Sequence, residues 1–354
     1  MLRIAFFQND VGVGGIQKSI VNLLKNIDYS RVKADLFLCE NNNFFQAEFP
    51  EKLKIYNLPP VPQYYKYLPF DFALSKVDIG LSALEPYDLA IDFNSYQPAC
   101  AIGAITVPAK KRVMWIHNNV RIKYHEEWKY RVLWNAFKGK FKYFDEFVPC
   151  SEALWEPFTE LARVTDKPHS VIHNYIDVDD IRRKAEIPCD SFQPDTNCLN
   201  FIALGKLCHQ KGYDLMLEAF AAACRYRNDL RLYILGDGPD RTKLEEQRNK
   251  LLLKDRVFFL GNQPNPYCYM QKADCFISTS RYEGQPLNIM EARVIGLPLY
   301  CSKNLEKYSS GLLGVENMEE TLISAKKESK NPDDLVEYNR EIIQNLELLA
   351  QNLI

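Results

Sequence analysis

The chain has 354 residues, about twice the length of a typical domain, which predicts two domains. Hydrophobic residues make up 47% and charged residues 25%, with 15 Gly and 19 Pro, which excludes fibrous and low-complexity proteins. The 44 Lys and Arg residues nearly balance 46 Asp and Glu residues, and the net charge of -2 argues against a nucleic-acid-binding protein.

Short apolar runs alternate with helical periods along the whole chain. The apolar runs predict strands at 3–8, 34–39, 88–93, 112–117, 145–149, 169–173, 199–204, 230–235, 256–260, 274–279 and 298–301. Several runs are apolar throughout, as expected for parallel strands that are covered on both faces. Helices are predicted at 15–26, 212–226, 239–252, 286–296 and 334–353. This alternation predicts an α/β protein with two doubly wound parallel sheets.

The alternation stops at 186–198, where Pro188, Pro194 and several polar residues occur. We therefore expect an N-terminal Rossmann-like domain over 1–185, a linker over 186–198 and a C-terminal Rossmann-like domain over 199–333. The last helix, 334–354, is a candidate to pack back on the N-terminal domain. Ligands of open α/β sheets bind at the carboxyl ends of the strands, so we expect the site in a cleft between the domains.

The cysteines and the N-terminus bear on the cellular compartment. The ten cysteines show no C-x-x-C spacing and mostly interrupt apolar segments, which predicts small buried side chains in a reducing compartment. Residues 1–7 lead directly into a strand and lack the shape of a signal peptide. The most apolar stretch, 99–109, is much shorter than the ~20 residues that span a bilayer. We expect a cytoplasmic protein.

The first strand-to-helix loop, 9–17, contains Gly14 and Gly15. Glycine there lets a ligand approach the backbone, and the start of the following helix favours negative charge. The dinucleotide fingerprint G-x-G-x-x-G fails because Gln17 occupies its third glycine position, although Glu40 could imitate the acid that holds a cofactor ribose. A tight turn without a ligand is the simpler alternative. An NAD site is disfavoured.

Three further strand ends carry candidate residues. His117 ends the predicted strand 112–117, although a lone histidine is more often structural than catalytic. In the second domain Lys206 and Lys211 share one strand-to-helix loop, where both could approach a phosphate chain. Surface lysines are common, so the pair alone is weak support. A second glycine turn, 235–239, follows the next strand at the same edge.

The most specific pattern lies at 280–292. Glu283 lies in a loop after a strand, Pro286 takes a favoured first-turn position of a helix, and Glu291 lies inside that helix. The amides of residues 285–288 are free to bind an anion, and both carboxylates can accept hydrogen bonds from hydroxyl groups. This combination suits a sugar nucleotide. The simpler alternative is a capping acid followed by a solvated helix glutamate.

Taken in order, these motifs resemble the retaining glycosyltransferases of family 4, which have the GT-B fold of two Rossmann-like domains facing a deep cleft. The E-x7-E pair of that family corresponds to Glu283 and Glu291. The remaining matches are Gly14, Gly15, His117, 171–177, Gly205-Lys206, Lys211-Gly212, 236–239 and 257–261. Lys206 departs from the arginine that is common there. The segment after Pro298 looks shortened, and no residue role is transferred to it.

The resemblance implies transfer of a sugar from a nucleotide sugar with the anomeric configuration retained. It implies catalytic roles for Glu283, His117, Lys206 and Lys211. It implies donor binding by Gly14, Gly15, Gly205, Lys206, Lys211, Gly236, Gly238, Glu283, Gly284, Gln285, Pro286, Leu287, Asn288 and Glu291. Glu283 would hold the donor sugar and Glu291 the ribose, while the two lysines would neutralise the leaving diphosphate.

The same resemblance suggests the other reaction components. We expect a UDP-linked donor, with a GDP-linked donor as the alternative, and a glycan or lipid-linked acceptor in surface polysaccharide or glycoconjugate synthesis. No cofactor and no metal are expected, because no Asp-x-Asp sequence lies at a strand end. Two other functions stay open: a sugar-nucleotide epimerase of the same architecture, and a sugar-nucleotide-binding subunit without turnover.

A basic and aromatic segment, 121–143, is the last candidate site. Aromatic residues at helical spacing with basic flanks are typical of an interfacial helix on an anionic membrane, here the inner leaflet. The candidate contacts are Trp128, Arg131, Trp134, Lys138 and Lys142, and residues 64–67 could extend the same surface. The alternative is an ordinary helix that packs its aromatic stripe on the sheet.

Overall fold

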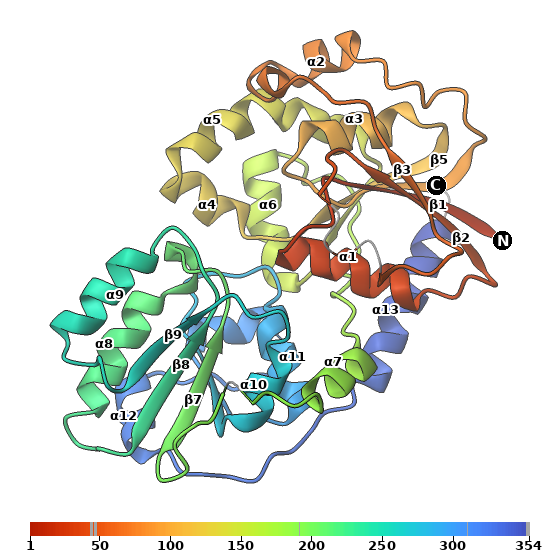
Figure 1. Cartoon of the computed structure of the whole chain (residues 1–354). Helices are drawn as coiled ribbons and strands as arrows, with labels where there is room; N and C mark the ends of the chain where they lie inside the picture. The colour runs from red at the N-terminus through yellow and green to blue at the C-terminus, as the bar shows by residue number, and fades with distance from the viewer. Residues whose placement is uncertain (43–44, 46–47, 191, 310, 352–354) are drawn as a thin grey trace. The chain divides into compact units, whose positions relative to one another are not determined.

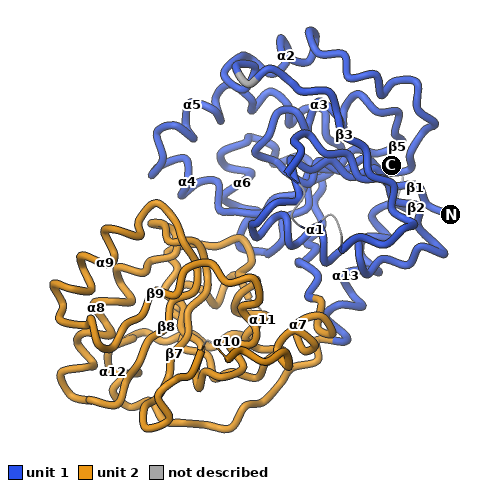
Figure 2. The backbone as a smooth tube through the Cα atoms, in the orientation of Figure 1, with its two compact units in different colours: residues 1–176, 336–354 blue, residues 177–335 orange. Residues whose placement is uncertain are grey.

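The computed structural model describes residues 1–42, 45, 48–190, 192–309 and 311–351. The chain folds into two compact units (Figure 2): unit 1 comprises Met1–Ile176 and Val336–Ile354, and unit 2 comprises Asp177–Leu335. The expected linker, 186–198, therefore lies within unit 2. There Lys272 Nζ donates hydrogen bonds to the carbonyl oxygens of Cys189 (2.6 Å) and Phe192 (2.9 Å), which tie this segment to unit 2.

Unit 1 is built on a six-stranded parallel sheet with the order β3-β2-β1-β4-β5-β6, of which β1, β2, β3 and β5 are labelled in Figure 1. Its strands are β1 (Leu2–Gln8), β2 (Val32–Leu38), β3 (Lys54–Asn57), β4 (Tyr87–Asp92), β5 (Ala109–Ile116) and β6 (Glu146–Pro149). Its α-helices are α1 (Gly15–Asn26), α2 (Phe70–Lys76), α3 (Pro98–Thr106), α4 (Val120–Glu126), α5 (Trp128–Phe137), α6 (Trp155–Ala162) and α13 (Val336–Gln351). The 3-10 helices are η2 (Gln63–Tyr67), η3 (Lys138–Tyr143) and η4 (Glu152–Leu154).

The last helix of the chain belongs to the core of unit 1. Ile342 and Leu346 of α13 are buried in the same cluster as Ile20 and Leu24 of α1. Residues four apart lie on one face of a helix, so both helices present an apolar stripe to this core. The junction is also fixed by hydrogen bonds, because Ile176 N donates to Asn339 Oδ1 (3.1 Å) and Asn339 Nδ2 donates to Ile176 O (2.8 Å).

Unit 2 is built on a five-stranded parallel sheet with the order β11-β10-β7-β8-β9. Its strands are β7 (Leu199–Leu204), β8 (Leu230–Leu235), β9 (Val257–Gly261), β10 (Cys275–Ser278) and β11 (Leu299–Cys301). Its helices are α7 (Val178–Ala185), η5 (His209–Lys211), α8 (Tyr213–Ala223), α9 (Arg241–Lys250), α10 (Tyr267–Lys272), α11 (Leu287–Ile295), η6 (Lys303–Tyr308) and α12 (Met318–Ser324).

The predicted α/β class with two parallel sheets is confirmed, and two strand assignments differ. The predicted strand at 169–173 does not form, and only His169 makes an isolated bridge, with Phe147. The strand β3 escaped prediction because it is a short edge strand whose four residues are mostly exposed. Such a strand lacks the apolar run by which the buried strands were recognised.

Each sheet has one point where its strand order reverses. In unit 1 this switch point lies between β1 and β4, and in unit 2 it lies between β7 and β10. In open sheets of this kind, the loops that leave the two strands of a switch point turn to opposite faces, and ligands bind at the carboxyl ends of those strands. Each unit therefore has one place where its topology favours a ligand.

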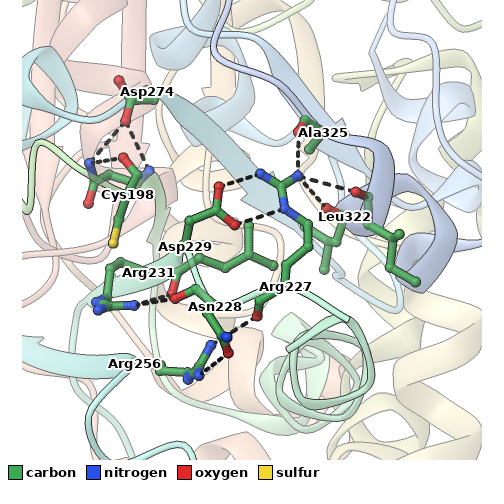
Figure 3. A network of polar contacts seen from close by, with 12 residues as sticks. Cys198, Arg227, Asn228, Asp229, Arg231, Arg256, Asp274, Leu322 and Ala325 are labelled. Carbon is green, nitrogen blue, oxygen red and sulfur yellow. Dashed lines mark hydrogen bonds and ion pairs between the residues drawn. The ribbon is translucent and has the colours of Figure 1, made fainter. Parts of the chain in front are cut away.

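The opposite, amino-terminal edge of the unit 2 sheet carries a closed polar network (Figure 3). Arg227 donates through two nitrogens to the carboxylate of Asp229, at 2.9 and 2.7 Å, just before β8. It also donates to the carbonyl oxygens of Leu322, Ile323 and Ala325 at the C-terminal end of α12. A helix leaves its last carbonyl groups without intrahelical partners, and Arg227 provides donors for them. This network ties the C-terminal end of α12 to the start of β8.

Candidate functional site

The candidate residues of unit 2 meet at its switch point. The loop after β7 carries Lys206 and Lys211, and the loop after β10 carries Glu283. Gly212 directly precedes α8 with φ 64°, and a Cβ atom there would lie 2.1 Å from Thr279 O, so only glycine allows this approach. Thr279 Oγ1 also donates to Gly212 O at 2.8 Å. The two loops are therefore in direct contact.

An ion pair joins the two loops at the centre of this contact. Lys211 Nζ lies 2.7 Å from Glu283 Oε1, and the Glu283 side chain is buried. Gln210 Nε2 donates to Tyr282 O at 3.1 Å and lies 3.4 Å from Glu283 Oε2. Charge-assisted hydrogen bonds of this length are strong, and here they hold the carboxylate in one orientation. The expected Lys211 and Glu283 are thus brought together and bind each other.

A second pair supports the same loops and escaped the sequence reasoning. Arg281 donates to both carboxylate oxygens of Asp214, at 2.8 and 2.6 Å, and holds the pKa of that carboxyl below its usual value. Arg281 N also donates to Gln210 O at 2.8 Å. No motif marks Asp214 in the sequence, because its partner lies 67 positions away. Only the folded chain reveals this pair.

The helix α11 begins directly behind Glu283. Pro286 lies just before the helix rather than in its first turn, and as a proline it has no N–H group. The donors expected over 285–288 therefore exclude Pro286, and Leu287 and Asn288 supply the amides at the start of α11. The first turn of α11 contains no acidic residue, so no side chain of its own neutralises the positive end of the helix dipole. This helix end favours an anion.

Two side chains connect α11 to the strands. Asn288 Nδ2 donates to Leu204 O, at the end of β7, at 2.6 Å. Glu291 is buried, and Tyr267 OH donates to its Oε1 at 3.3 Å. The alternative of a solvated helix glutamate is therefore wrong for Glu291. A buried carboxylate inside a helix needs hydrogen-bond donors, which Tyr267 supplies in part.

The glycines at 205, 236 and 238 are explained by contacts within the chain. A Cβ at Gly236 would lie 2.0 Å from Gly205 O, and one at Gly238 would lie 2.3 Å from Leu207 O. Leu207 N donates to Asp237 O at 3.0 Å, so the loops after β7 and β8 pair backbone to backbone. Their role in donor binding stays a prediction. Lys206 is exposed, and no hydrogen bond or ion pair joins its side chain to the described part of the chain.

The candidate residues of unit 1, Gly14, Gly15 and His117, lie at its switch point or beside it. His117 follows β5 and is buried, and its Nε2 lies 2.8 Å from Phe93 O. A carbonyl oxygen only accepts, so Nε2 carries the proton. Burial lowers the pKa of His117 to about 3, so the ring is neutral at neutral pH and Nδ1 is a hydrogen-bond acceptor. The structure thus gives His117 an acceptor atom and no acidic proton to release.

The loop after β1 is organised by Asp10, which the sequence reasoning did not single out. Asn9 Nδ2 donates to Asp10 Oδ2 (2.8 Å), and Gly12 N donates to Asp10 Oδ1 (2.8 Å). An aspartate that accepts from the amide two residues ahead is a common turn signal, so Asp10 followed by Gly12 could have been recognised. Gly14 directly precedes α1, and a Cβ at Gly15 would meet nothing within 4 Å of the described residues.

The basic and aromatic segment divides into buried and exposed residues. Trp134 is 2% exposed, and its ring centroid lies 5.1 Å from that of Phe141 and 6.2 Å from that of Phe158. The expectation that Trp134 contacts a membrane is therefore wrong, because it packs inside unit 1. Trp128 is 68% exposed. Arg131, Lys138 and Lys142 are exposed as well. Within the described residues, no helix is long and apolar enough to cross a membrane.

The remaining expectations concern cysteines and metals. All ten cysteines are free thiols, and seven of them are buried, which confirms the expected role as small apolar side chains. The other three, Cys39, Cys208 and Cys224, are half-buried. Across the described ranges, no group of three or more His, Cys, Asp or Glu side chains is arranged to hold a metal ion.

The match to a known protein family lies in the second half of the chain. The family model "Glycosyl transferases group 1" matches residues 191–351. An uncharacterized glycosyltransferase of Methanocaldococcus jannaschii is 27% identical over 191 residues, which cover 53% of this chain and 47% of that protein. The chain thus spans about half the length of this relative.

A second relative matches over most of both chains. The N-acetylgalactosamine-N,N'-diacetylbacillosaminyl-diphospho-undecaprenol 4-alpha-N-acetylgalactosaminyltransferase of Campylobacter jejuni is 24% identical over 322 residues. The match covers 85% of this chain and 81% of that enzyme. The N-terminal half, where the family motifs are sparse, is thus included in this similarity.

Solved structures show the fold. Anabaena Alr3699/HepE, in complex with UDP and glucose, superposes with a TM-score of 0.63 at 18% identity, covering 100% of this chain and 95% of that chain. The lipopolysaccharide outer core galactosyltransferase WaaB superposes with a TM-score of 0.61 at 16% identity, covering 99% of each chain. The GT-B fold class predicted from the motifs is confirmed. Residues 191–351 match the glycosyl transferases group 1 family, on a chain that has the fold of these glycosyltransferases.

Proposed function

We propose that this protein transfers a sugar from a nucleotide sugar to a hydroxyl-bearing acceptor and retains the anomeric configuration. The observation that carries the proposal is the ion pair between the half-buried Lys211 and the buried Glu283, just before the start of α11 at the switch point of unit 2. Topology, positive potential and a fixed carboxylate coincide there. These are the features that a diphosphate linked to a sugar requires.

Each polar group of this switch point receives a role in the proposal. The start of α11 and the exposed Lys206 bind the diphosphate, because both offer positive charge and Lys206 has no competing ion pair with the described residues. Glu291 accepts hydrogen bonds from the ribose. Glu283 binds the donor sugar, and Lys211 stabilises negative charge that develops as the diphosphate leaves. Removing one such contact typically slows an enzyme by about 100-fold or more.

The chemical step needs no protein nucleophile. The bond between the anomeric carbon and the phosphate oxygen breaks, and the acceptor oxygen forms its bond on the same face of the sugar. The acceptor proton passes to the departing phosphate oxygen. Glu283 is unsuited to act as a base because its carboxylate is already paired with Lys211 at 2.7 Å. We propose that the reaction is independent of a metal, with the two lysines in its place.

The donor and acceptor are proposed from the relatives. HepE was solved with UDP and glucose, and a second solved structure contains UDP-2-fluoro glucose, which supports a UDP-linked donor over a GDP-linked one. The Campylobacter enzyme is named for a diphospho-undecaprenol-linked glycan, which supports a lipid-linked acceptor. We assign the acceptor to unit 1 and the donor to unit 2.

A lipid-linked acceptor requires the protein to work beside a membrane, on its cytoplasmic face. The exposed surface of α5 and η2 is suited to this contact, because η2 packs against α5 and both carry exposed aromatic residues. Lys129 Nζ lies 5.8 Å from the ring centre of Trp128, and Lys66 Nζ lies 5.3 Å from that of Tyr67. Aromatic rings beside lysines suit the interface of an anionic bilayer.

The experiment is incubation of the full chain with a panel of UDP- and GDP-sugars, with and without an undecaprenol-linked glycan. The expected result is release of UDP that depends on the acceptor and continues in EDTA. Isomerisation of the sugar on the nucleotide would instead show an epimerase. Binding without turnover under every condition would show a non-catalytic subunit. Restoration of lost activity by manganese would contradict the metal-independent mechanism.

A further inference from the structure

The switch point of unit 1 holds a lysine that is completely buried. Lys140, in η3, and Asp92, the last residue of β4, are both 0% exposed. Lys140 Nζ donates to Ser95 O at 2.5 Å and lies 3.8 Å from Asp92 Oδ2. The same ammonium group lies 4.8 Å from the ring centre of Phe137. A lysine without solvent contact is rare, so its presence requires an explanation.

Stability does not explain this pair. Burial raises the pKa of Asp92 to about 6 and lowers the pKa of Lys140, so both charged forms are penalised by the interior. Asp92 Oδ2 has no hydrogen-bond partner among the described residues. Apolar residues of similar volume often replace a buried ion pair without loss of stability. The pair therefore calls for a role other than holding the fold together.

The pair closes a turn that contains Phe93. Asp92 Oδ1 accepts a hydrogen bond from Asn94 N at 3.1 Å, and Lys140 holds Ser95 O. Phe93 N donates to Phe7 O at 2.9 Å, which fixes the turn to β1. Both sides of Phe93 are thus held, and the direction of its carbonyl group is set by these contacts.

The carbonyl of Phe93 determines the state of His117. Its oxygen accepts from His117 Nε2 at 2.8 Å, and the two ring centroids lie 4.6 Å apart. The nitrogen that faces a carbonyl must carry the proton, and the other nitrogen is then an acceptor. The contacts form a continuous path from Lys140 through the turn to the imidazole.

We propose that Lys140 is a positioning residue that acts through Asp92 and Ser95 on Phe93 and so keeps His117 in the tautomer whose Nδ1 accepts a hydrogen bond from a substrate hydroxyl. The part that concerns the substrate rests on the proposed function. The part that concerns the tautomer does not, and the two parts can be tested separately.

The chain supplies a matched control in the same unit. Lys111, in β5, is also buried and forms an ion pair of 2.7 Å with Glu146, at the amino-terminal edge of β6. Lys111→Met and Lys140→Met each remove one buried lysine from unit 1, and the two lysines lie near opposite edges of its sheet. A merely structural role would make the two variants alike. A positioning role changes His117 only in Lys140→Met.

The tautomer is measured by nitrogen NMR of the full chain labelled in its five histidines, with His117→Gln assigning the signal of His117. We expect the Nε2-protonated form in the wild type and in Lys111→Met, and a mixture of tautomers in Lys140→Met. Asp92→Asn keeps the acceptor for Asn94 N and should shift His117 in the same direction but less. It serves as the second variant should Lys140→Met fold poorly.

Turnover supplies the second readout. Lys140→Met should lower kcat about tenfold while the affinity for free UDP stays unchanged, because misplacement of one contact slows the chemistry without touching unit 2. An unchanged tautomer in both Lys140→Met and Asp92→Asn, or an equal shift in Lys111→Met, would overturn the positioning role. A shifted tautomer in a protein without transfer activity would overturn the proposed function and support the positioning role.

Discussion

The two switch points share one topology and differ in how their polar groups are satisfied. In unit 2 the ion pair of Lys211 with Glu283 crosses from one loop to the other, and that of Arg281 with Asp214 ties the second loop to the start of α8. In unit 1 the amide of Gln8, at the end of β1, is fully buried, and neither its Nε2 nor its Oε1 has a partner in the described chain. The loops of the unit 2 switch point are thus already joined by ion pairs, whereas the unit 1 switch point contains a buried amide without a hydrogen-bond partner among the described residues.

This difference has an energetic meaning. A buried polar group without a partner costs roughly 1–3 kcal/mol, which a hydrogen bond to a ligand or a water recovers. A site whose side chains are already ion-paired recovers little free energy of this kind from a ligand. It binds the ligand through charged groups that are already oriented. We therefore expect changes to the ion pairs of unit 2 to affect turnover, and removal of an unpartnered buried amide in unit 1, such as that of Gln8, to affect stability first.

The largest effect should come from the ion pair of unit 2. Lys211→Met and Glu283→Gln should each lower kcat by about 100-fold or more, because each removes a contact that we assign to the transition state. Asp214→Asn breaks the neighbouring ion pair, for which no donor contact is proposed, and should change kcat by less than about threefold. Initial rates with saturating donor measure all three. If all three variants lost the same factor in kcat, the ion pair of Lys211 with Glu283 would only hold the loops in place and would not contact the transition state.

Glu291 should affect binding rather than the chemical step. Glu291→Ala should weaken free UDP and the UDP-sugar alike by roughly 1.5–3 kcal/mol, because a charged acceptor of the ribose is lost. Glu283→Gln should leave the affinity for free UDP nearly unchanged, because that side chain is proposed to bind only the sugar. Calorimetry with free UDP and the intact donor separates the two. The reverse pattern would exchange the roles of the two glutamates.

The comparison between the units can be tested with two matched glutamines. Gln8→Met replaces an unpartnered buried amide by an apolar chain of similar length and should raise the free energy of unfolding by about 1 kcal/mol. Gln210→Met removes the donor to Tyr282 O and should lower it by a similar amount. Denaturant unfolding measures both. If Gln8→Met destabilised the protein, the Gln8 amide would have hydrogen-bond partners in solution, and the proposed difference between the two switch points would not hold.

The smallest effect concerns pH. The folded pKa of His117, about 3, lies below the unfolded value near 6.5, so the unfolded state binds the proton first. The contribution of His117 should lower the free energy of unfolding as pH drops below about 6.5, by roughly 1 kcal/mol at pH 5.5, and His117→Gln should remove this contribution. Asp92, whose pKa is raised to about 6, acts in the opposite direction, and comparison of the variant with the wild type subtracts its contribution. Parallel unfolding curves of both proteins from pH 7.5 to 5 would show that His117 is not buried in solution.

Much of the fold was predictable because burial leaves a sequence signal. The apolar strands of both sheets and the helix over 15–26 were predicted close to their observed bounds. The pair of Glu283 and Glu291 could also be found from the sequence, because the two residues are only eight positions apart in one loop and helix. What depends on distant partners was out of reach. Nothing in the sequence near 176 shows that Asn339 closes the boundary of unit 1 there.

One wrong prediction and one omission show what a pattern within a single segment cannot reveal. The aromatic stripe that contains Trp134 has the spacing of an amphipathic helix, and that spacing is the same whether the stripe meets lipid or other aromatic rings. Lys140 lies among exposed lysines in the same segment, yet it is the one whose ammonium group is enclosed. Composition cannot distinguish a buried lysine from its solvated neighbours, because the difference is made by Asp92 and Ser95, which lie more than 40 positions away.

The return of α13 to unit 1 has a consequence for synthesis on the ribosome. Unit 2 is continuous in sequence and can fold as soon as residue 335 has emerged, while unit 1 still lacks Ile342 and Leu346 from its core. Its first 176 residues must therefore wait, with an incompletely covered sheet face, until the second unit has been translated. A translational pause or a stop codon shortly after residue 335 would leave a folded unit 2 attached to an aggregation-prone partner. The helix α13 thus determines when the sheet of unit 1 is fully covered and the nascent chain is protected from aggregation.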